Sequence, residues 1–406
     1  MPRLPPSLIQ RARSISPRLA TLLPACRDLD SARNELRWIR DHVAASTSTD
    51  DSSCPPSTQA AANPERRSNH ERKVASLCRR RARGEPLQYL LGSQPFGPLD
   101  IQCRRGVLIP RPETETWTYA LASEVVARLA GTTSSSSSPE DAKKKEKTLR
   151  IVDFCTGTGC IPLLLYALLH RRFRNLQVWG FDVEERAVRL ARENLRYNVA
   201  RGLLPSPLPS PGEEPSAATA RSNRAENDVR FEVADIFADD WLQLLPRQDG
   251  GTGGIDVLVS NPPYISTKGF NRDTGRSVRN HEPKLALVPY PRPNTASDLD
   301  GQGAAEGCAP EDVFYERLCE VARILKPKIM LFEVGDLDQA LRVAQMAVMA
   351  TGEKLQDLEI WRDCPDVEET EPTADSEQPL KETYIEGRKV LIKGSGHGRS
   401  VFVHLG

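Results

Sequence analysis

The sequence lacks long hydrophobic runs, paired cysteines and an excess of either charge. No apolar run reaches about 18 residues, the length that a membrane-spanning helix needs. The nine cysteines are dispersed without a Cys-x-x-Cys pair, which disfavours a zinc site or disulfide framework and favours a reducing compartment. Lys and Arg number 55, as do Asp and Glu, so net charge does not draw the chain toward nucleic acid. We expect no membrane contact, no metal and no direct nucleic-acid binding.

Hydrophobic residues are also scarce, at 39%, while proline is frequent at 32. The polarity gathers in low-complexity stretches and leaves the apolar core segments intact. Residues 46–69 are rich in Ser, Thr and Pro, and we expect this insert to be disordered. Further inserts are expected at residues 131–147, 202–228, 271–310 and 365–379. Residues 271–310 are long and irregular, which is typical of a lid or binding loop.

Acidic residues are absent from residues 1–27, which contain five arginines. This composition is typical of a mitochondrial transit peptide. The alternative is a first helix of an N-terminal domain, and the two can coexist if only the extreme N-terminus is removed. The apolar face of that helix would consist of Leu8, Ala12, Ile15, Leu19 and Leu22.

A basic helix is expected at residues 71–83, after a helix at residues 31–44 whose apolar side carries Leu36, Ile39 and Val43. The basic helix ends in a run of arginines, which suits ribosomal RNA or an acidic partner. A solvated helix face is the alternative, and such a charge run favours it.

The core of the chain is organised around Asn261-Pro262-Pro263-Tyr264, which follows a buried strand at residues 254–260. Proline has no N–H and a fixed φ, so the Pro262 carbonyl is rigidly held and free to accept a hydrogen bond. The Asn261 side-chain oxygen is a second acceptor, and Tyr264 offers a flat face. Two hydrogen-bond acceptors and a flat aromatic ring suit a planar –NH2 group. The alternative is a strand-ending turn, because Asn-Pro and Pro-Pro are common turn dipeptides.

A second motif consists of a strand, a glycine turn and an apolar helix. The strand covers residues 149–154, Gly157 and Gly159 form the turn, and the helix covers residues 161–169. The glycines let the backbone approach a ligand, and the helix N-terminus favours a carboxylate or phosphate. A dinucleotide fingerprint requires a third glycine where this chain has Pro162, which argues against NAD or FAD.

Acidic residues follow the next two expected strands. Asp182 closes residues 176–181, where a carboxylate can bind both hydroxyls of a ribose; its alternative role is a cap for the following helix. The strand at residues 229–233 leads to Asp235-Ile236, which can hold adenine by its amine and one apolar face. Asp235 can equally cap the next helix.

These motifs, in this order, resemble a class I S-adenosylmethionine-dependent methyltransferase acting on a planar amine. Residues 84–92 and 108–115, with His281-Glu282-Pro283 and Ala286-Leu287, resemble the PrmC/HemK family. Members of that family methylate the side-chain nitrogen of the glutamine in the Gly-Gly-Gln motif of peptide-chain release factors. The resemblance covers roughly residues 70–405. It departs at Cys155, where the family often has glycine or another small residue.

The resemblance implies an α/β fold with a Rossmann-like, seven-stranded sheet whose last strand is antiparallel. A small helical, substrate-binding domain at residues 1–92 and a linking hairpin at residues 93–111 would precede the catalytic domain at residues 112–406. Residues 383–392 and 400–405 would form the last two antiparallel strands, and Gly394 to Gly398 a hairpin loop between them.

The resemblance also implies the site residues, and we expect S-adenosylmethionine as cofactor, a release factor as partner, and a monomer. Residues 108–115 would floor the cofactor pocket or begin a helix, and both roles are compatible. The expected catalytic residues are Asn261, Pro262 and Tyr264. The expected substrate-binding residues are these with Pro263, Arg111, Glu113, His281 and Glu282. The expected cofactor-binding residues are Asp153, Cys155, Thr156, Gly157, Thr158, Gly159, Asp182, Asp235, Ile236 and Asn261.

Two rival functions use the same features. A nucleic-acid adenine or cytosine methyltransferase carries a similar tetrapeptide but normally adds a recognition domain and a basic cleft. A non-catalytic module that kept the fold would be expected to lose Asn261. The balanced charge and the presence of Asn261 favour the release-factor reaction, placed in the mitochondrial matrix if the N-terminal composition directs import, and otherwise in the cytoplasm.

Overall fold

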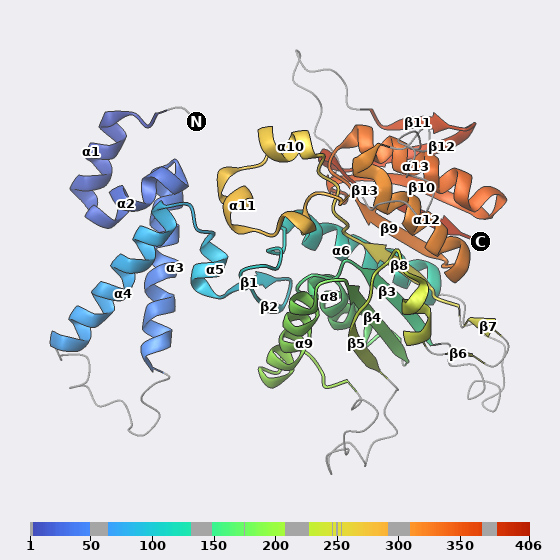
Figure 1. Ribbon diagram of the computed structural model, residues 1–406, viewed down its shortest axis with the longest axis horizontal. Helices are drawn as coiled ribbons and strands as arrows, with labels where there is room; N and C mark the ends of the chain where they lie inside the picture. Colours follow the sequence, from blue (N-terminus) through green and yellow to red (C-terminus); the bar gives the residue numbers. More distant parts are fainter. Residues whose placement is uncertain are drawn as a thin grey trace, which may run out of the picture. The chain divides into compact units, whose positions relative to one another are not determined.

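The computed structural model describes residues 3–48, 64–130, 148–173, 175–207, 227–245, 247–248, 251–252, 254–290, 309–367 and 380–406 (Figure 1). The chain divides into two compact units. Unit 1 comprises Met1–Gln94, Cys103–Arg105 and Thr274–Glu282, and unit 2 comprises Pro95–Gln102, Gly106–Asp273 and Pro283–Gly406. The expected insert at 131–147 lies outside the described residues, as do 49–63, 208–226, 291–308 and 368–379 of the other four.

Unit 1 is helical. Its elements are α1 (Pro6–Ile15), α2 (Pro17–Cys26), α3 (Leu29–Ser48), α4 (Pro64–Ala82), α5 (Leu87–Leu91) and α11 (Arg276–His281). One apolar core joins α2, α3 and α4, and includes Leu22, Leu36, Ile39, Val43 and Cys78. Helices α3 and α4 therefore extend into both ends of the insert that the sequence indicated to be disordered.

The expected single helix at the N-terminus is two helices. Ser16 is extended, with φ −164° and ψ 134°, and begins α2 with Pro17 at its first turn. A residue before proline is disfavoured in the α region, so the chain turns here. The expected apolar face is split accordingly. Ala12, Leu19 and Leu22 are buried, but Ile15, at the end of α1, is 49% exposed.

Two arginines of the basic helix α4 are structural. The Arg81 guanidinium pairs with Glu35 of α3 at 2.7 Å, and Arg80 pairs with Glu85 at 2.6 Å. Glu85 is buried and also pairs with Arg105 at 2.7 Å. These three arginines consequently fix unit 1 internally, which neither sequence interpretation of the run anticipated.

Unit 2 is built on a nine-stranded sheet with the order β11-β12-β10-β13-β9-β8-β3-β4-β5. The strands are β3 (Leu149–Phe154), β4 (Leu176–Asp182), β5 (Asp228–Val233), β8 (Val257–Ser260), β9 (Ile329–Glu333), β10 (Leu355–Cys364), β11 (Glu382–Ile385), β12 (Arg388–Lys393) and β13 (Ser395–Leu405). Neighbours from β9 to β5 pair in parallel, whereas β13 is antiparallel to both β9 and β10. The expected mostly parallel sheet with an antiparallel last strand is confirmed, although it has nine strands where seven were expected.

The sequence interpretation of the last strands was wrong in three respects. It missed β10. Residues 383–392 are not one strand, because β11 and β12 form an antiparallel pair that extends the sheet beyond β10. Residues 394–398 are not a hairpin loop, since β13 begins at Ser395 and β10 separates it from β12. Patterns within one segment cannot reveal a strand inserted from elsewhere.

Helices cover both faces of this sheet. One apolar core packs α6 (Pro112–Val125), α8 (Cys160–Leu169) and α9 (Glu185–Ala200) against one face, and another packs α12 (Val313–Leu325) and α13 (Leu337–Thr351) against the other (Figure 1). The remaining elements of both units are β1 (Ser93–Phe96), β2 (Leu99–Gln102), η3 (Val126–Ala130), η5 (Asp239–Leu244), β6 (Arg247–Gln248), β7 (Gly251–Thr252), α10 (Thr267–Arg272), η6 (Lys284–Ala286), η8 (Pro310–Asp312) and η9 (Gly352–Lys354).

Two further boundaries differ from the sequence interpretation. The linking hairpin consists of β1 and β2 and ends at Gln102, within the expected residues 93–111. Residues 271–290 are not irregular, because they include the end of α10, the whole of α11 and η6. Within the described part of the chain, no helix combines the length and apolarity needed to cross a membrane.

Candidate active site

The expected motifs meet at the carboxyl edge of the parallel strands. Strands β8 and β3 are neighbours, while the chain continues from β3 outward through β4 and β5, and from β8 outward to β9. The strand order therefore reverses between β3 and β8, and ligands of open α/β sheets bind at such a point. The glycine turn follows β3 and the tetrapeptide follows β8, so the two motifs flank this position. The hydroxyl of Ser260 donates to the Phe154 carbonyl at 2.8 Å and fastens the two strand ends together.

The glycine turn has an unusual backbone. Cys155, Gly157 and Gly159 all have positive φ, at 62°, 57° and 78°. Gly159 also needs its missing side chain, because a Cβ there would lie 2.9 Å from both Ala191 and Phe231. Helix α8 starts directly after it, with Pro162 in its first turn as expected. The turn thus places the N-terminus of α8 at the strand edge.

Asp182 connects the turn to the next strand. One carboxylate oxygen accepts from the Gly157 N–H at 2.8 Å, and the other accepts from the Glu184 N–H at 2.9 Å. Burial raises the pKa of this carboxyl to about 6, although both N–H groups oppose the shift. Asp182 therefore connects the glycine turn to the segment before α9 but is not the N-cap of that helix, which is Glu184. Its role in binding ribose stays a prediction.

Asp153 is the most unusual acid at this edge. Its side chain is fully buried, and neither carboxylate oxygen has a hydrogen-bond partner among the described residues. Burial raises the pKa of Asp153 well above its ordinary value, although the neighbouring Thr156 side chain opposes the shift; the Asp182 charge adds a smaller rise. A buried carboxyl without a partner is costly and points to a missing polar group. S-adenosylmethionine carries such groups, and the turn, Asp153 and Asp182 fit it.

Asp235 and Ile236 follow β5 as expected. The Asp235 carboxylate accepts from the Phe237 N–H at 3.0 Å in a local turn, but it does not cap the next helix, because the N-cap residue of η5 is Ala238. Ile236 is buried. Thr156 and Thr158, the remaining residues proposed for the cofactor, are buried within the glycine turn, and the Thr156 N–H donates to the Phe181 carbonyl at 3.0 Å.

The tetrapeptide is held by the first turn of α6 and the end of β9. The Asn261 side-chain N–H2 donates to the Thr114 hydroxyl at 3.3 Å. The Tyr264 hydroxyl donates to Glu333 at 3.1 Å. Gly335 makes room for the ring, because a Cβ there would be 3.2 Å from Tyr264. Burial, reinforced by the Glu333 charge, raises the pKa of Tyr264, so this tyrosine stays neutral.

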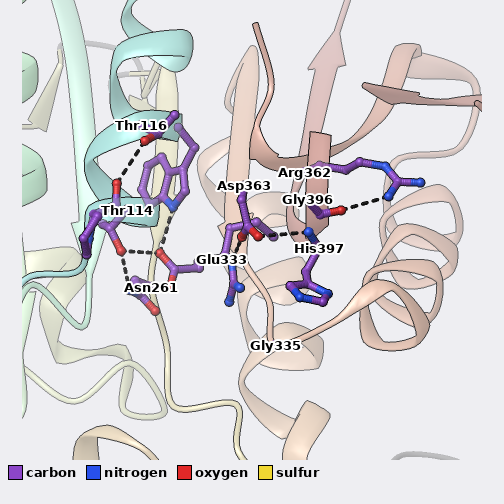
Figure 2. Close-up of polar contacts among 12 residues, drawn as sticks. Thr114, Thr116, Asn261, Glu333, Gly335, Arg362, Asp363, Gly396 and His397 are labelled. Atoms are coloured by element: carbon purple, nitrogen blue, oxygen red, sulfur yellow. Dashed lines mark hydrogen bonds and ion pairs between the residues drawn. The ribbon is translucent and has the colours of Figure 1, made fainter. Parts of the chain in front are cut away.

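Glu333 contacts both the first turn of α6 and the tetrapeptide, and Figure 2 shows Thr114 bonded to Glu333 and to Asn261. One of its carboxylate oxygens accepts from the Thr114 hydroxyl at 2.5 Å and from the Trp117 indole N–H at 2.7 Å. The other accepts from Tyr264. Glu333 is 1% exposed, and burial raises its pKa against the opposing effect of these donors. A buried carboxylate therefore contacts the tetrapeptide directly at Tyr264 and, through Thr114, at Asn261.

Sequence reasoning missed Thr114, Trp117 and Glu333. The available signal was an acid that ends the otherwise apolar strand β9, a position where an unpaired carboxylate is costly. Two of the residues expected to bind substrate, Arg111 and Glu113, lie at the start of α6. Arg111 is the N-cap residue of α6 and Glu113 lies in its first turn, but Thr114 is the residue of this segment that contacts Asn261.

His281 and Glu282 belong to unit 1, where they end α11. The ring of His281 bonds the Ser277 carbonyl at 3.1 Å, and the Ser277 hydroxyl donates to the Gly84 carbonyl at 2.6 Å. Glu282 is buried. These contacts join the two stretches that carried the family resemblance, while the role of His281 and Glu282 in substrate binding stays a prediction.

The chain is similar to known proteins that are named as glutamine methyltransferases. No family model matches. The mitochondrial MRF1 N(5)-glutamine methyltransferase MTQ1 of Saccharomyces cerevisiae is 33% identical over 289 residues, which cover 71% of this chain and 68% of that protein. A probable MRF1 mitochondrial N(5)-glutamine methyltransferase of Schizosaccharomyces pombe is 34% identical over 53% and 56% of the two chains. The release factor glutamine methyltransferase of Thermodesulfovibrio yellowstonii is 27% identical over 71% and 77%.

Solved structures add little. The catalytic domain of hMettl16, in complex with the MAT2A 3'UTR hairpin 1, is 13% identical over 81% of this chain and 80% of that chain, with a TM-score of 0.38. A TM-score this low carries no argument about activity. The extent of the MTQ1 match and the arrangement of the glycine turn and tetrapeptide decide the assignment: the chain belongs to the release factor glutamine methyltransferases, which are S-adenosylmethionine-dependent enzymes of the class I methyltransferase fold.

Proposed function

We propose that this protein transfers a methyl group from S-adenosylmethionine to the side-chain amide nitrogen of the glutamine in the Gly-Gly-Gln motif of a mitochondrial release factor. The observation that carries the proposal is the position of Asn261-Pro262-Pro263-Tyr264 beside the glycine turn, at the point where the strand order reverses. An acceptor-rich segment for a planar amide thereby adjoins a cofactor-type loop.

The residues at the strand edge fit the cofactor. The N-terminus of α8 favours its carboxylate, Asp153 suits its ammonium group, and Asp182 suits its ribose hydroxyls. The buried Ile236 and the neighbouring Asp235 suit adenine. When bound, S-adenosylmethionine supplies a methyl carbon made electrophilic by the positive sulfonium.

The chain's own residues bind and orient the amide. An amide nitrogen is a poor nucleophile because its lone pair is delocalised into the carbonyl. Asn261 and the Pro262 carbonyl accept its two N–H bonds, and Tyr264 packs against its plane. Such positioning can contribute several kcal/mol, up to roughly 7–11 kcal/mol in well-oriented systems. The acceptors also stabilise the positive charge that develops on nitrogen in the transition state.

The mitochondrial assignment rests on two observations. The yeast relative is named as mitochondrial, and residues 1–27 are basic and free of acids. Ala12 is buried in the core of unit 1, and Leu4, Leu8 and Ile9 pack against that core, so cleavage within α1 would remove part of the packing of unit 1. Import of a fluorescent fusion of this chain, followed by N-terminal sequencing, tests the location and the cleavage position.

The reaction is tested by tandem mass spectrometry of release factors incubated with the protein and S-adenosylmethionine. A gain of one methyl on the Gly-Gly-Gln glutamine of a mitochondrial factor, absent with Asn261→Ala, supports the proposal. A cytosolic release factor and duplex DNA serve as parallel substrates. Methylation of the cytosolic factor alone would show that the substrate is a cytosolic and not a mitochondrial release factor. Methylation of DNA alone would support the rival adenine reaction.

A further inference from the structure

The buried carboxylate of Glu333 receives hydrogen bonds from three neutral donors. These come from the first two turns of α6 and from the tetrapeptide: the Thr114 hydroxyl, the Trp117 indole and the Tyr264 hydroxyl. In the structure Glu333 accepts all three hydrogen bonds, which is the arrangement of an ionised carboxylate held by its donors against the cost of burial. Each of the three donors is therefore committed to Glu333, and the direction of the network is fixed from this one residue.

The direction matters most at Thr114. A hydroxyl has a single hydrogen, and that of Thr114 is used on Glu333 at 2.5 Å. Toward Asn261 the same oxygen can only accept. The Asn261 side chain consequently turns its N–H2 to Thr114, at 3.3 Å, and its carbonyl oxygen to the opposite side (Figure 2). The flipped amide would place two acceptors against each other.

The second oxygen of Glu333 fixes Tyr264. The Tyr264 hydroxyl donates to it at 3.1 Å, and the Tyr264 backbone carbonyl accepts from Gln339 at 3.3 Å. Gln339 is itself buried and bonded to Asp312 at 2.8 Å. The ring is thus held at both its hydroxyl end and its backbone end, from β9 and α13.

We propose that Glu333 is a positioning residue. It acts through Thr114 to fix which end of the Asn261 amide, the oxygen or the N–H2, points to the substrate, and it acts directly on Tyr264. The inference rests on the proposed function for the identity of the substrate amide. Its chemistry is specific: an incoming –NH2 group needs an acceptor, and the Asn261 carbonyl oxygen is that acceptor only in the orientation that Thr114 imposes. Without this bias the amide can present a donor to a donor and repel the substrate.

Substitution of Thr114 tests the proposal more cleanly than substitution of Glu333, because the buried Glu333 also bonds Trp117 and its loss endangers folding. Thr114→Val keeps the shape and removes the hydroxyl. Thr114→Ser keeps the hydroxyl. Thr118→Val is the matched control, since Thr118 is also buried on α6 but its hydroxyl donates to the Thr114 backbone carbonyl at 2.6 Å.

We expect Thr114→Val to lower kcat for release-factor methylation at least tenfold, with the cofactor Kd from calorimetry and the Tm close to wild type. Thr114→Ser and Thr118→Val are expected to stay within about threefold of the wild-type kcat. Two outcomes would overturn the proposal: a wild-type kcat for Thr114→Val, or equal losses in Thr114→Val and Thr118→Val.

A second measurement does not need the substrate. With 15N-asparagine labelling, the side-chain N–H2 signals of Asn261, assigned by their absence in Asn261→Asp, report its partner. We expect them to shift and to exchange faster in Thr114→Val, and to keep their wild-type positions in Thr118→Val. Unchanged Asn261 signals in Thr114→Val would contradict the inference. If no release factor is methylated even by the wild type, the proposed function fails, while this spectrum still decides the role of Thr114.

Discussion

Asp182 and Gly157 are joined by a hydrogen bond of 2.8 Å from the Gly157 N–H to the Asp182 carboxylate. The bond links the turn after β3 to the end of β4, two strands that the chain connects only through α8. The second oxygen of Asp182 accepts from Glu184. Each carboxylate oxygen has two lone pairs, so both retain capacity for a ligand hydroxyl. The structural and the ligand-binding roles of Asp182 are therefore compatible.

Cofactor affinity should depend on pH through Asp182. Its folded pKa is raised to about 6 from an ordinary value of 3.8, so the carboxyl becomes protonated as pH falls below about 6. Protonation removes the charged acceptor for the ribose hydroxyls. We expect the Kd for S-adenosylmethionine to be constant above pH 7 and to rise below pH 6, by up to about tenfold per pH unit. Calorimetry across pH 5–8 measures this. Asp182→Asn should bind weakly at every pH, and an unaltered pH dependence in that variant would assign the effect to another group.

Asn261→Ala should separate chemistry from cofactor binding. The variant loses the side-chain acceptor for the substrate amide, while the glycine turn and Asp182 are unaffected. We expect a loss in kcat of about 10²-fold or more, the size typical of removing one transition-state hydrogen bond, with a cofactor Kd close to wild type. Single-turnover methylation and calorimetry are the two measurements. A parallel loss of affinity and turnover would indicate that Asn261 supports the cofactor or the fold.

Cys155 should be replaceable by glycine at a gain in stability. Its φ of 62° is in the left-handed region, which costs a residue with a side chain about 1–2 kcal/mol. We expect Cys155→Gly to raise the free energy of unfolding by about 1 kcal/mol, and the β-branched Cys155→Val to lower it by more than that. Thermal and urea unfolding with cofactor absent measure both variants. A lower stability for Cys155→Gly would mean that contacts of the thiol outweigh the backbone strain.

Glu85 should stabilise unit 1 in a pH-dependent way. Hydrogen bonding to Arg80 and Arg105 lowers its pKa to about 2 from 4.5. Its contribution is therefore complete above pH 4.5 and is lost as pH falls toward 2. We expect Glu85→Gln to cost on the order of 2–3 kcal/mol at pH 7, with the difference from wild type constant to pH 5 and shrinking below it.

The control for Glu85 is Asp30→Asn. Asp30 pairs with Arg33 at 2.9 Å on the surface of α3, and both side chains are largely exposed. Exposed pairs contribute about 0–1 kcal/mol, so this variant should unfold almost as wild type does. Urea unfolding monitored by circular dichroism compares the two. If both variants lose the same stability, the two ion pairs of the buried Glu85 contribute no more than a surface pair.

Much of the site was readable because its motifs are local. Gly157 and Gly159, Asp182 and the tetrapeptide each follow an apolar strand, and the carboxyl ends of parallel strands must share one edge of the sheet. Pro162 argued against NAD or FAD because a dinucleotide fingerprint requires glycine at that single position. Local patterning also located Leu36, Ile39 and Val43 in the core of unit 1. Such inferences need only the period of a helix or strand and the chemistry of one turn.

What the sequence by itself determined, then, is the order of the motifs and the chemistry each can perform. Only the tertiary structure decided which side chains support them. Thr114 and Glu333 are 219 residues apart, and no local sequence pattern around either residue predicts their 2.5 Å hydrogen bond. Strand β10 went unnoticed for the same reason, because its pairing with β13 depends on which edge the chain returns to. Contacts between distant segments follow from the packing of whole elements, and short-range periodicity carries no information about that packing.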